Sequence, residues 1–163
     1  MVDPYPAGPE QPYRPPTKGE PPASVKTAVN LIWAGVAVSI LSTILTIVFM
    51  DDLIDDIVGA DAAIDRDTAQ VSVIVGAGFG IVLGVAIAIL FIYFLKKGAN
   101  WARIVYTVLL GLSIVFGLFG LLGSQPVVLL LLGLVGLVLS IATIVFLFRP
   151  DSNAFFSATT PTS

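Results

Sequence analysis

Four long apolar stretches constrain the fold of this chain more than any other feature. They cover residues 27–50, 70–95, 101–122 and 126–148, and Arg103 is the only charged residue in any of them. About 20 apolar residues are enough to cross the ~30 Å hydrocarbon core of a bilayer as a helix. The strands of a membrane barrel would instead alternate between apolar and polar residues, which these stretches do not. The sequence therefore predicts an all-α integral membrane protein, a four-helix bundle with up-down topology.

The composition agrees with a membrane location and argues against several kinds of chemistry. Only 12% of the 163 residues are charged, whereas a soluble domain carries about 25% charged residues. Cysteine and histidine are absent, which removes disulfides, thiolate ligands and the commonest general base. Serines lie in the spans, but no Asp, Lys or His lies at their depth to activate them. We therefore expect no enzymatic activity, no cofactor, no built metal site and no nucleic-acid partner.

The distribution of Lys and Arg predicts the orientation of the spans. Seven of the eight basic residues lie on one side of the predicted membrane, and only Arg66 lies on the other. Because loops rich in Lys and Arg stay in the cytoplasm, we expect both termini there. Charged and amphipathic side chains should anchor the spans at the cytoplasmic boundary. These anchors are Lys96, Lys97, Trp101, Arg103 and Arg149.

Capping residues predict where the helices begin and end. Side chains that make good N-caps precede the four spans; they are Ser24, Asp67, Asn100 and Ser124. Asp67 and Gln70 also form a pair that resembles a capping box. We expect Gly98 to stop the second helix and Pro150 to close the fourth. The spans then form one domain over 25–149, between a Pro-rich cytoplasmic tail at 1–24 and a flexible tail at 150–163.

The external loop at 51–67 carries seven aspartates, which are Asp51, Asp52, Asp55, Asp56, Asp61, Asp65 and Asp67. Leu53, Ile54, Ile57 and Val58 recur opposite the first four at helical spacing, so the first helix is expected to continue past Met50 until Gly59. The loop lacks the aspartate spacing and the glutamate of a calcium-binding loop. We favour a solvated external face. The alternatives are a docking surface for a basic partner and a weak cation site.

Small residues in the spans predict where helices approach closely, because apolar burial does not drive helix association in lipid. In the second span they step strictly by four, as Ser72, Gly76, Gly80, Gly84 and Ala88. We call these five residues the glycine stripe. In the other three spans the small residues follow a seven-residue spacing, which is typical of helices that pack with a left-handed, coiled-coil-like crossing. The glycine stripe could pack against a neighbour in the same chain, a second copy or another membrane protein.

The N-terminal tail holds prolines three residues apart, at Pro6, Pro9, Pro12 and Pro15. In a polyproline II helix these would line one edge, which could bind an aromatic groove on a cytoplasmic partner. A disordered tether is the favoured alternative.

Two short segments resemble a known group. The sequences "KKGANWARIVY" at 96–106 and "FRPDSNAFF" at 148–156 are similar to those of uncharacterised small four-span membrane proteins of actinobacteria. These often have a Pro/Tyr-rich cytoplasmic tail. The resemblance implies a plasma-membrane location and supplies no activity.

These observations favour a scaffold or accessory subunit of a plasma-membrane complex. Transporters and proton relays normally keep ionisable side chains within the membrane, and the interiors of these spans have none. The alternative is a small homo-oligomeric pore or exporter, since a line of span hydroxyls could wet a narrow path.

Overall fold

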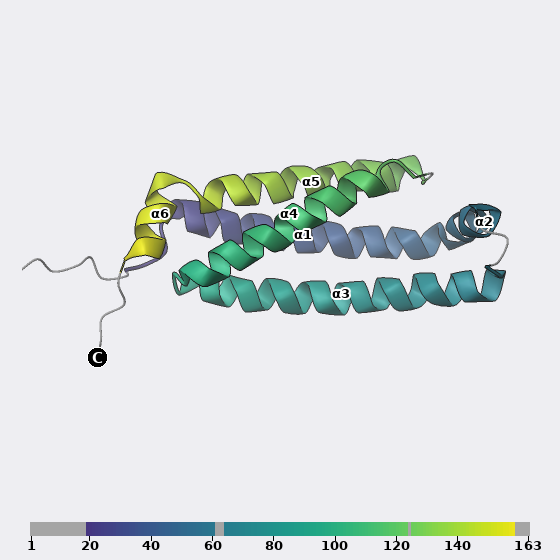
Figure 1. The fold of residues 1–163 in the computed structure, drawn as a ribbon, viewed down its shortest axis with the longest axis horizontal. Coiled ribbons are helices and arrows are strands. Elements are labelled where there is room, and N and C mark those ends of the chain that lie inside the picture. The colour runs from purple at the N-terminus through teal and green to yellow at the C-terminus, as the bar shows by residue number, and fades with distance from the viewer. Residues whose placement is uncertain (1–18, 61–63, 124, 159–163) are drawn as a thin grey trace, which may run out of the picture.

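The computed structural model describes residues 19–60, 64–123 and 125–158, and every element among them is an α-helix (Figure 1). The helices are α1 (Ala23–Val48), α2 (Met50–Ala60), α3 (Arg66–Lys96), α4 (Asn100–Gly120), α5 (Val127–Leu147) and α6 (Pro150–Ser157). Four of them, α1, α3, α4 and α5, are long and apolar enough to cross a membrane. The all-helical class and the four apolar spans are thus confirmed. The proline pattern of the tail, Asp61 and Ser124 lie outside the described residues.

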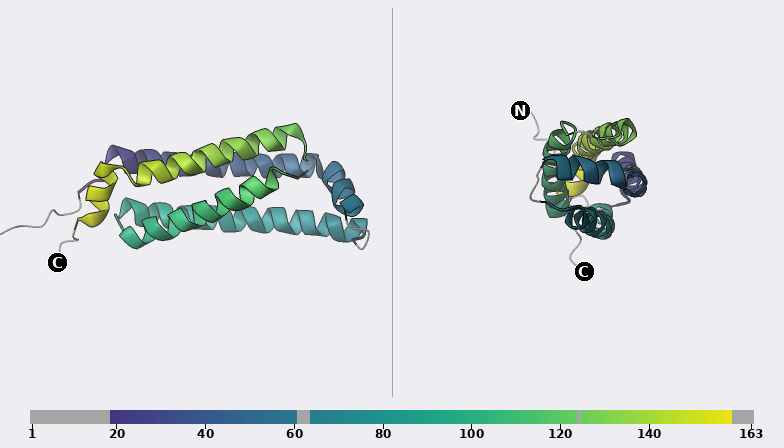
Figure 2. Two further views of the ribbon diagram at one scale, coloured as in Figure 1. Left: turned by 45° about the horizontal axis from the view of Figure 1, so that its top comes forward. Right: turned by 90° about the vertical axis from the view of Figure 1, so that its right-hand side faces the viewer.

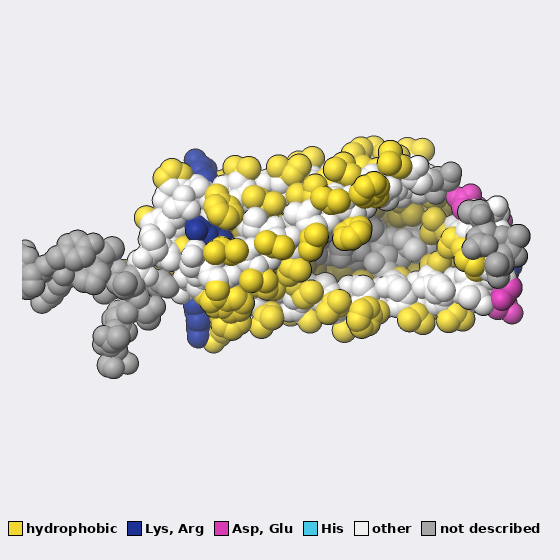
Figure 3. Space-filling view, in the orientation of Figure 1, with side chains coloured by type: hydrophobic (Ala, Val, Ile, Leu, Met, Phe, Trp, Pro, Cys, Tyr) yellow, Lys and Arg dark blue, Asp and Glu magenta, His cyan; other side chains and the backbone are white. Residues whose placement is uncertain are grey.

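The four long helices lie side by side, and the two short ones lie at opposite ends (Figures 1 and 2). Helix α6 lies where α1 begins and α5 ends, and Lys and Arg side chains form a narrow band there (Figure 3). We call this the basic end. Helix α2 crosses the opposite end, where the Asp side chains gather. We call that the acidic end.

Fully buried side chains concentrate near the basic end. Val25, Leu95, Ala102 and Leu147 are each 0% exposed and belong to one cluster that joins α1, α3, α4 and α5. Phe91 adds ring contacts to α4, with its centroid 5.2 Å from that of Tyr106 and 6.2 Å from that of Trp101. The long helices are therefore held together most tightly at this end.

Toward the acidic end the helices separate. Helix α4 starts beside α3 and crosses obliquely to finish beside α5 (Figure 1). Two glycines allow its close approach to α5: a Cβ on Gly117 would lie 3.1 Å from Leu137 Cδ2, and a Cβ on Gly133 would lie 3.2 Å from Leu121 Cδ2. The small residues expected to mark an interface therefore do so between α4 and α5, while α3 and α4 diverge.

The bounds of the four apolar spans agree with those of the long helices to within four residues, but several capping residues differ. Asp65, not Asp67, caps α3, because its carboxylate accepts a 2.9 Å hydrogen bond from the Thr68 N–H. That bond lowers the pKa of Asp65. Helices α1 and α4 begin after Pro22 and Ala99, so Ser24 and Asn100 lie inside the helices instead of capping them.

Gly98 ends α3 as expected, and its φ of 69° explains why a glycine is needed there. The N–H of Gly98 donates to Leu95 O at 2.9 Å, and that of Ala99 donates to Phe94 O at 3.0 Å. This pair of bonds is a Schellman motif. It turns the chain tightly from α3 into α4, which places the two helices side by side at the basic end.

The acidic segment after Met50 is helical but does not continue α1. The first helix ends at Val48, and α2 runs in a new direction to Ala60, so Gly59 lies within it. The amphipathic prediction holds, since Ile54 is 1% exposed while the neighbouring aspartates are exposed. Lying across the end of the long helices lets α2 bury its apolar face and keep its acids outside.

The segment from residue 150, expected to be flexible, contains helix α6. Pro150 occupies its first turn, which a proline tolerates well. Ser152, Phe155 and Phe156 are buried, and Ser152 Oγ lies 2.6 Å from Ser24 Oγ on α1. Hydrogen bonding from Ser24 also lowers the pKa of Asp151. Helix α6 is thus docked on α1, and a tail expected to be mobile closes the basic end.

Candidate functional site

The main cavity is a groove between the four long helices, with a volume of about 750 Å³. Figure 3 shows the hollow between α4 and α3. On α1 its lining reaches from Leu31 to Thr43, which at about 1.5 Å per residue corresponds to roughly 18 Å along the helix. Ile32, Ala88, Tyr106 and Thr143 line the groove and are also buried, so the core closes it at the basic end. It is a lateral pocket and not a channel through the chain.

Most of the glycine stripe lies in the wall of this groove. Gly76, Gly80 and Gly84 line it, and a Cβ added to any of them would meet no atom of a neighbouring helix within 4 Å. Ala88 is buried in the core, whereas Ser72 is exposed and donates to Thr68 O at 2.8 Å. In the structure the three glycines are therefore not in close contact with a neighbouring helix of the same chain. Helix α4 diverges from α3 before it reaches them.

Most hydroxyl groups in the groove are already used within their own helices. Thr43 Oγ1 donates to Ser39 O at 3.0 Å, and Ser113 Oγ donates to Leu110 O at 2.9 Å. Ser140 and Thr143 donate to Gly136 O and Leu139 O in the same way. Such bonds leave the wall with few free donors. The groove therefore suits an apolar occupant better than a chain of water or a hydrated ion.

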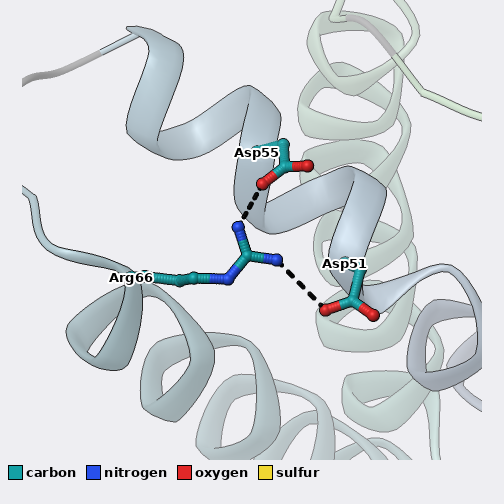
Figure 4. A network of polar contacts seen from close by, with 3 residues as sticks. All are labelled: Asp51, Asp55 and Arg66. Atoms are coloured by element: carbon teal, nitrogen blue, oxygen red, sulfur yellow. Dashed lines mark hydrogen bonds and ion pairs between the residues drawn. The ribbon is translucent and has the colours of Figure 1, made fainter.

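At the acidic end, Arg66 connects two of the candidate aspartates. The guanidinium at the start of α3 contacts Asp55 through Nη1 and Asp51 through Nη2, the latter at 3.2 Å (Figure 4). Both acids come from α2, so this pairing attaches α2 to α3. The guanidinium of Arg66 thus supplies the positive charge that these two aspartates face.

The other aspartates of this loop that the structure describes are not brought together into a site. Asp52, Asp56 and Asp67 are exposed, and Asp65 is used as the cap of α3. Among residues 19–60, 64–123 and 125–158, no group of three acidic side chains could hold a metal ion.

The predicted anchors lie at the basic end, where the apolar surface stops. Trp101 is 52% exposed and its ring centroid lies 4.9 Å from that of Phe94. Lys97 lies over the ring of Tyr93, 4.3 Å from its centroid, and Arg149 lies over that of Phe146. Lys96 is exposed in the last turn of α3. These positions fit side chains that combine an apolar stem with a charged or polar tip.

Arg103 differs from the other anchors, because contacts with α6 and with the residue after α5 hold its side chain in place. Its Nη1 donates to Asn153 Oδ1 on α6 at 2.7 Å, and its Cζ lies 4.7 Å from the ring centroid of Phe148. Sequence reasoning did not find this arrangement, since it depends on α6. The spacing of Asn153 and Phe156 is the signal that could have found it, because an amide and a ring three residues apart lie on one face of a helix and can both contact a guanidinium.

Comparisons of the chain with family models, with curated proteins and with solved structures give no match.

Proposed function

We propose that this protein is a non-enzymatic multi-pass protein of the plasma membrane, a scaffold or accessory subunit that holds a partner helix against the glycine stripe. The observation that carries this proposal is the open wall of the groove at Gly76, Gly80 and Gly84. Exposed glycines on an apolar helix let another backbone approach closely, which is the main route to helix association in lipid. No described atom of a neighbouring helix lies within 4 Å of a Cβ placed at these glycines, which favours a second copy or a different membrane protein.

The charge distribution supports the orientation that goes with this proposal. At the basic end, α1 and α4 begin and α3 and α5 end (Figure 1). The basic residues at these helix ends are Lys26, Lys96, Lys97, Arg103 and Arg149. Arg66 lies at the acidic end. By the positive-inside rule, the basic end faces the cytoplasm, together with the start of α1 and helix α6. Helix α2 then lies on the outer surface.

The non-enzymatic part of the proposal is supported by the lining of the groove. Its described lining residues include no Asp, Glu, Lys or Arg, and their only titratable side chain is that of Tyr106. A nucleophile would therefore have no base or metal beside it.

Affinity purification from native membranes tests the proposal. The wild-type protein should bring down a membrane partner, or a second copy, in stoichiometric amount. Gly80→Leu should lose that partner, because the leucine fills the position that the partner backbone would take. Since the same position is open in the isolated chain, the variant should still fold.

Val82→Leu is the matched control, because Val82 lies two residues along the same helix and is 69% exposed. It should retain the partner. Equal retention by both variants would contradict the proposed interface. Ion or solute flux from the purified protein in liposomes, blocked by a bulky residue at Ser42 or Ser140, would favour the homo-oligomeric pore instead.

A further inference from the structure

Arg103 carries a charge that no carboxylate among the described residues pairs with. Within the described part of the chain, the ion pairs join Lys26 to Glu20 and Arg66 to Asp51 and Asp55. Helix α6 contains one acid, Asp151. It takes part in hydrogen bonds with Ser24 on α1. Since charges that are partly removed from water are normally paired, a half-buried guanidinium at a helix junction without an anion among the described residues is unusual.

Neutral groups hold this guanidinium in place. Asn153 accepts one of its five N–H donors, and the rings of Phe148 and Phe156 have centroids 4.7 and 4.9 Å from its Cζ. The Nε atom is buried and has no hydrogen-bond partner. Asn153 is itself fixed, because its Nδ2 donates to Phe148 O at 3.1 Å. The side chain is therefore oriented in advance, while its charge and most of its donors remain unused.

The surroundings of Arg103 match the depth of lipid headgroups. Trp101 and Tyr93, which are 52% and 53% exposed, lie in the turns of α4 and α3 that meet at the basic end. Ile104, the next residue after Arg103, is 50% exposed and begins the apolar surface. Exposed Trp and Tyr rings prefer the boundary between hydrocarbon and water. In a bilayer this guanidinium would thus lie at the level of the lipid phosphates.

We propose that Arg103 binds the phosphate of an anionic lipid headgroup at the junction of α4, α5 and α6. A planar guanidinium donates two parallel hydrogen bonds to phosphate oxygens. Preorganisation by Asn153 and the two rings lowers the entropic cost of that contact. The other cations of the basic end add attraction for an anionic headgroup. The occupant is a lipid and not free phosphate, because the site adjoins exposed apolar side chains that acyl chains would cover.

Native mass spectrometry of the detergent-purified protein tests this site. Phosphatidylglycerol should remain bound to the wild type, and phosphatidylcholine with the same acyl chains should bind far less. Arg103→Gln should weaken phosphatidylglycerol binding by about tenfold or more, as expected for the loss of charge-assisted hydrogen bonds. Lys97→Gln removes the same charge from the same end and should change the binding by no more than about fivefold, the effect of a single exposed basic residue near the surface.

Asn153→Asp is a second variant that does not depend on removing the arginine. It places a carboxylate 2.7 Å from Nη1 of Arg103, which would pair the guanidinium internally. We therefore expect it to lose the lipid as Arg103→Gln does, while circular dichroism still reports a folded helical protein.

Two results would overturn the headgroup site. One is equal loss of phosphatidylglycerol in Arg103→Gln and Lys97→Gln, which would indicate diffuse attraction. The other is binding of inorganic phosphate as tight as that of the lipid. The inference rests on the membrane placement proposed above, and the two can fail separately. A chain that stays monomeric in water without detergent would contradict the placement, whereas lipid binding that ignores Arg103 would contradict only this site.

Discussion

Leu147→Ala is expected to lower the free energy of unfolding by about 2 kcal/mol or more, the lower part of the range for buried leucines. Leu147 is 0% exposed in the core near the basic end. Lipid tails are as apolar as leucine, so the loss comes mainly from packing contacts around the cavity that the alanine leaves. Steric trapping of the unfolded chain in mixed detergent micelles would measure this change in the free energy of unfolding.

Leu131→Ala provides the control for this experiment. Leu131 lies on the same helix, α5, and is 55% exposed, so its side chain would contact lipid in a bilayer. The exchange should change the unfolding free energy by less than about 0.5 kcal/mol, as for other substitutions outside the core. Comparable losses for the two variants would show that the core near the basic end does not hold the helices together.

Gly117→Leu is expected to destabilise the protein by about 1–3 kcal/mol, the usual cost of overpacking. A Cβ at this position would already lie 3.1 Å from Leu137 Cδ2, so the larger side chain must displace the Leu137 side chain or push α4 away from α5. Thermal unfolding in detergent, followed by helical circular dichroism, would detect the change.

Gly80→Leu is the matched comparison, because the same exchange is made on a helix wall that faces open space. It should leave the isolated chain as stable as the wild type or slightly more stable, since leucine favours a helix over glycine by up to about 1 kcal/mol. Destabilisation of both variants to the same extent would mean that the groove is filled in the folded chain, and the proposed interface would lose its basis.

The sequence predicted the long helices well, because each depends on local information. Twenty or more apolar residues without a charge permit little else in a bilayer, and Gly98 marked a turn that only a positive φ allows. Asp65 was missed as a cap because Asp67, two residues later, fits the same rule.

The parts that could not be predicted depend on how distant segments meet. The glycine stripe predicted a close helix contact on α3. It did not predict that α4 would diverge from α3, because that divergence follows from contacts of Gly117 and Gly133 on other helices. Helix α6 was missed since its short polar sequence becomes helical only by docking Ser152 and Phe156 against the long helices. The environment of Arg103 followed from that docking.

The placement of the chain in the membrane is tested most directly by labelling single cysteines in intact cells. The natural sequence has no cysteine, so Asp52→Cys on α2 and Ser157→Cys at the end of α6 each give one reactive thiol without background. Both positions are exposed. A maleimide that cannot cross membranes should label Asp52→Cys in intact cells, and Ser157→Cys only after the cells are opened. Labelling of Ser157→Cys in intact cells, with Asp52→Cys protected, would contradict the orientation on which the roles of both ends depend.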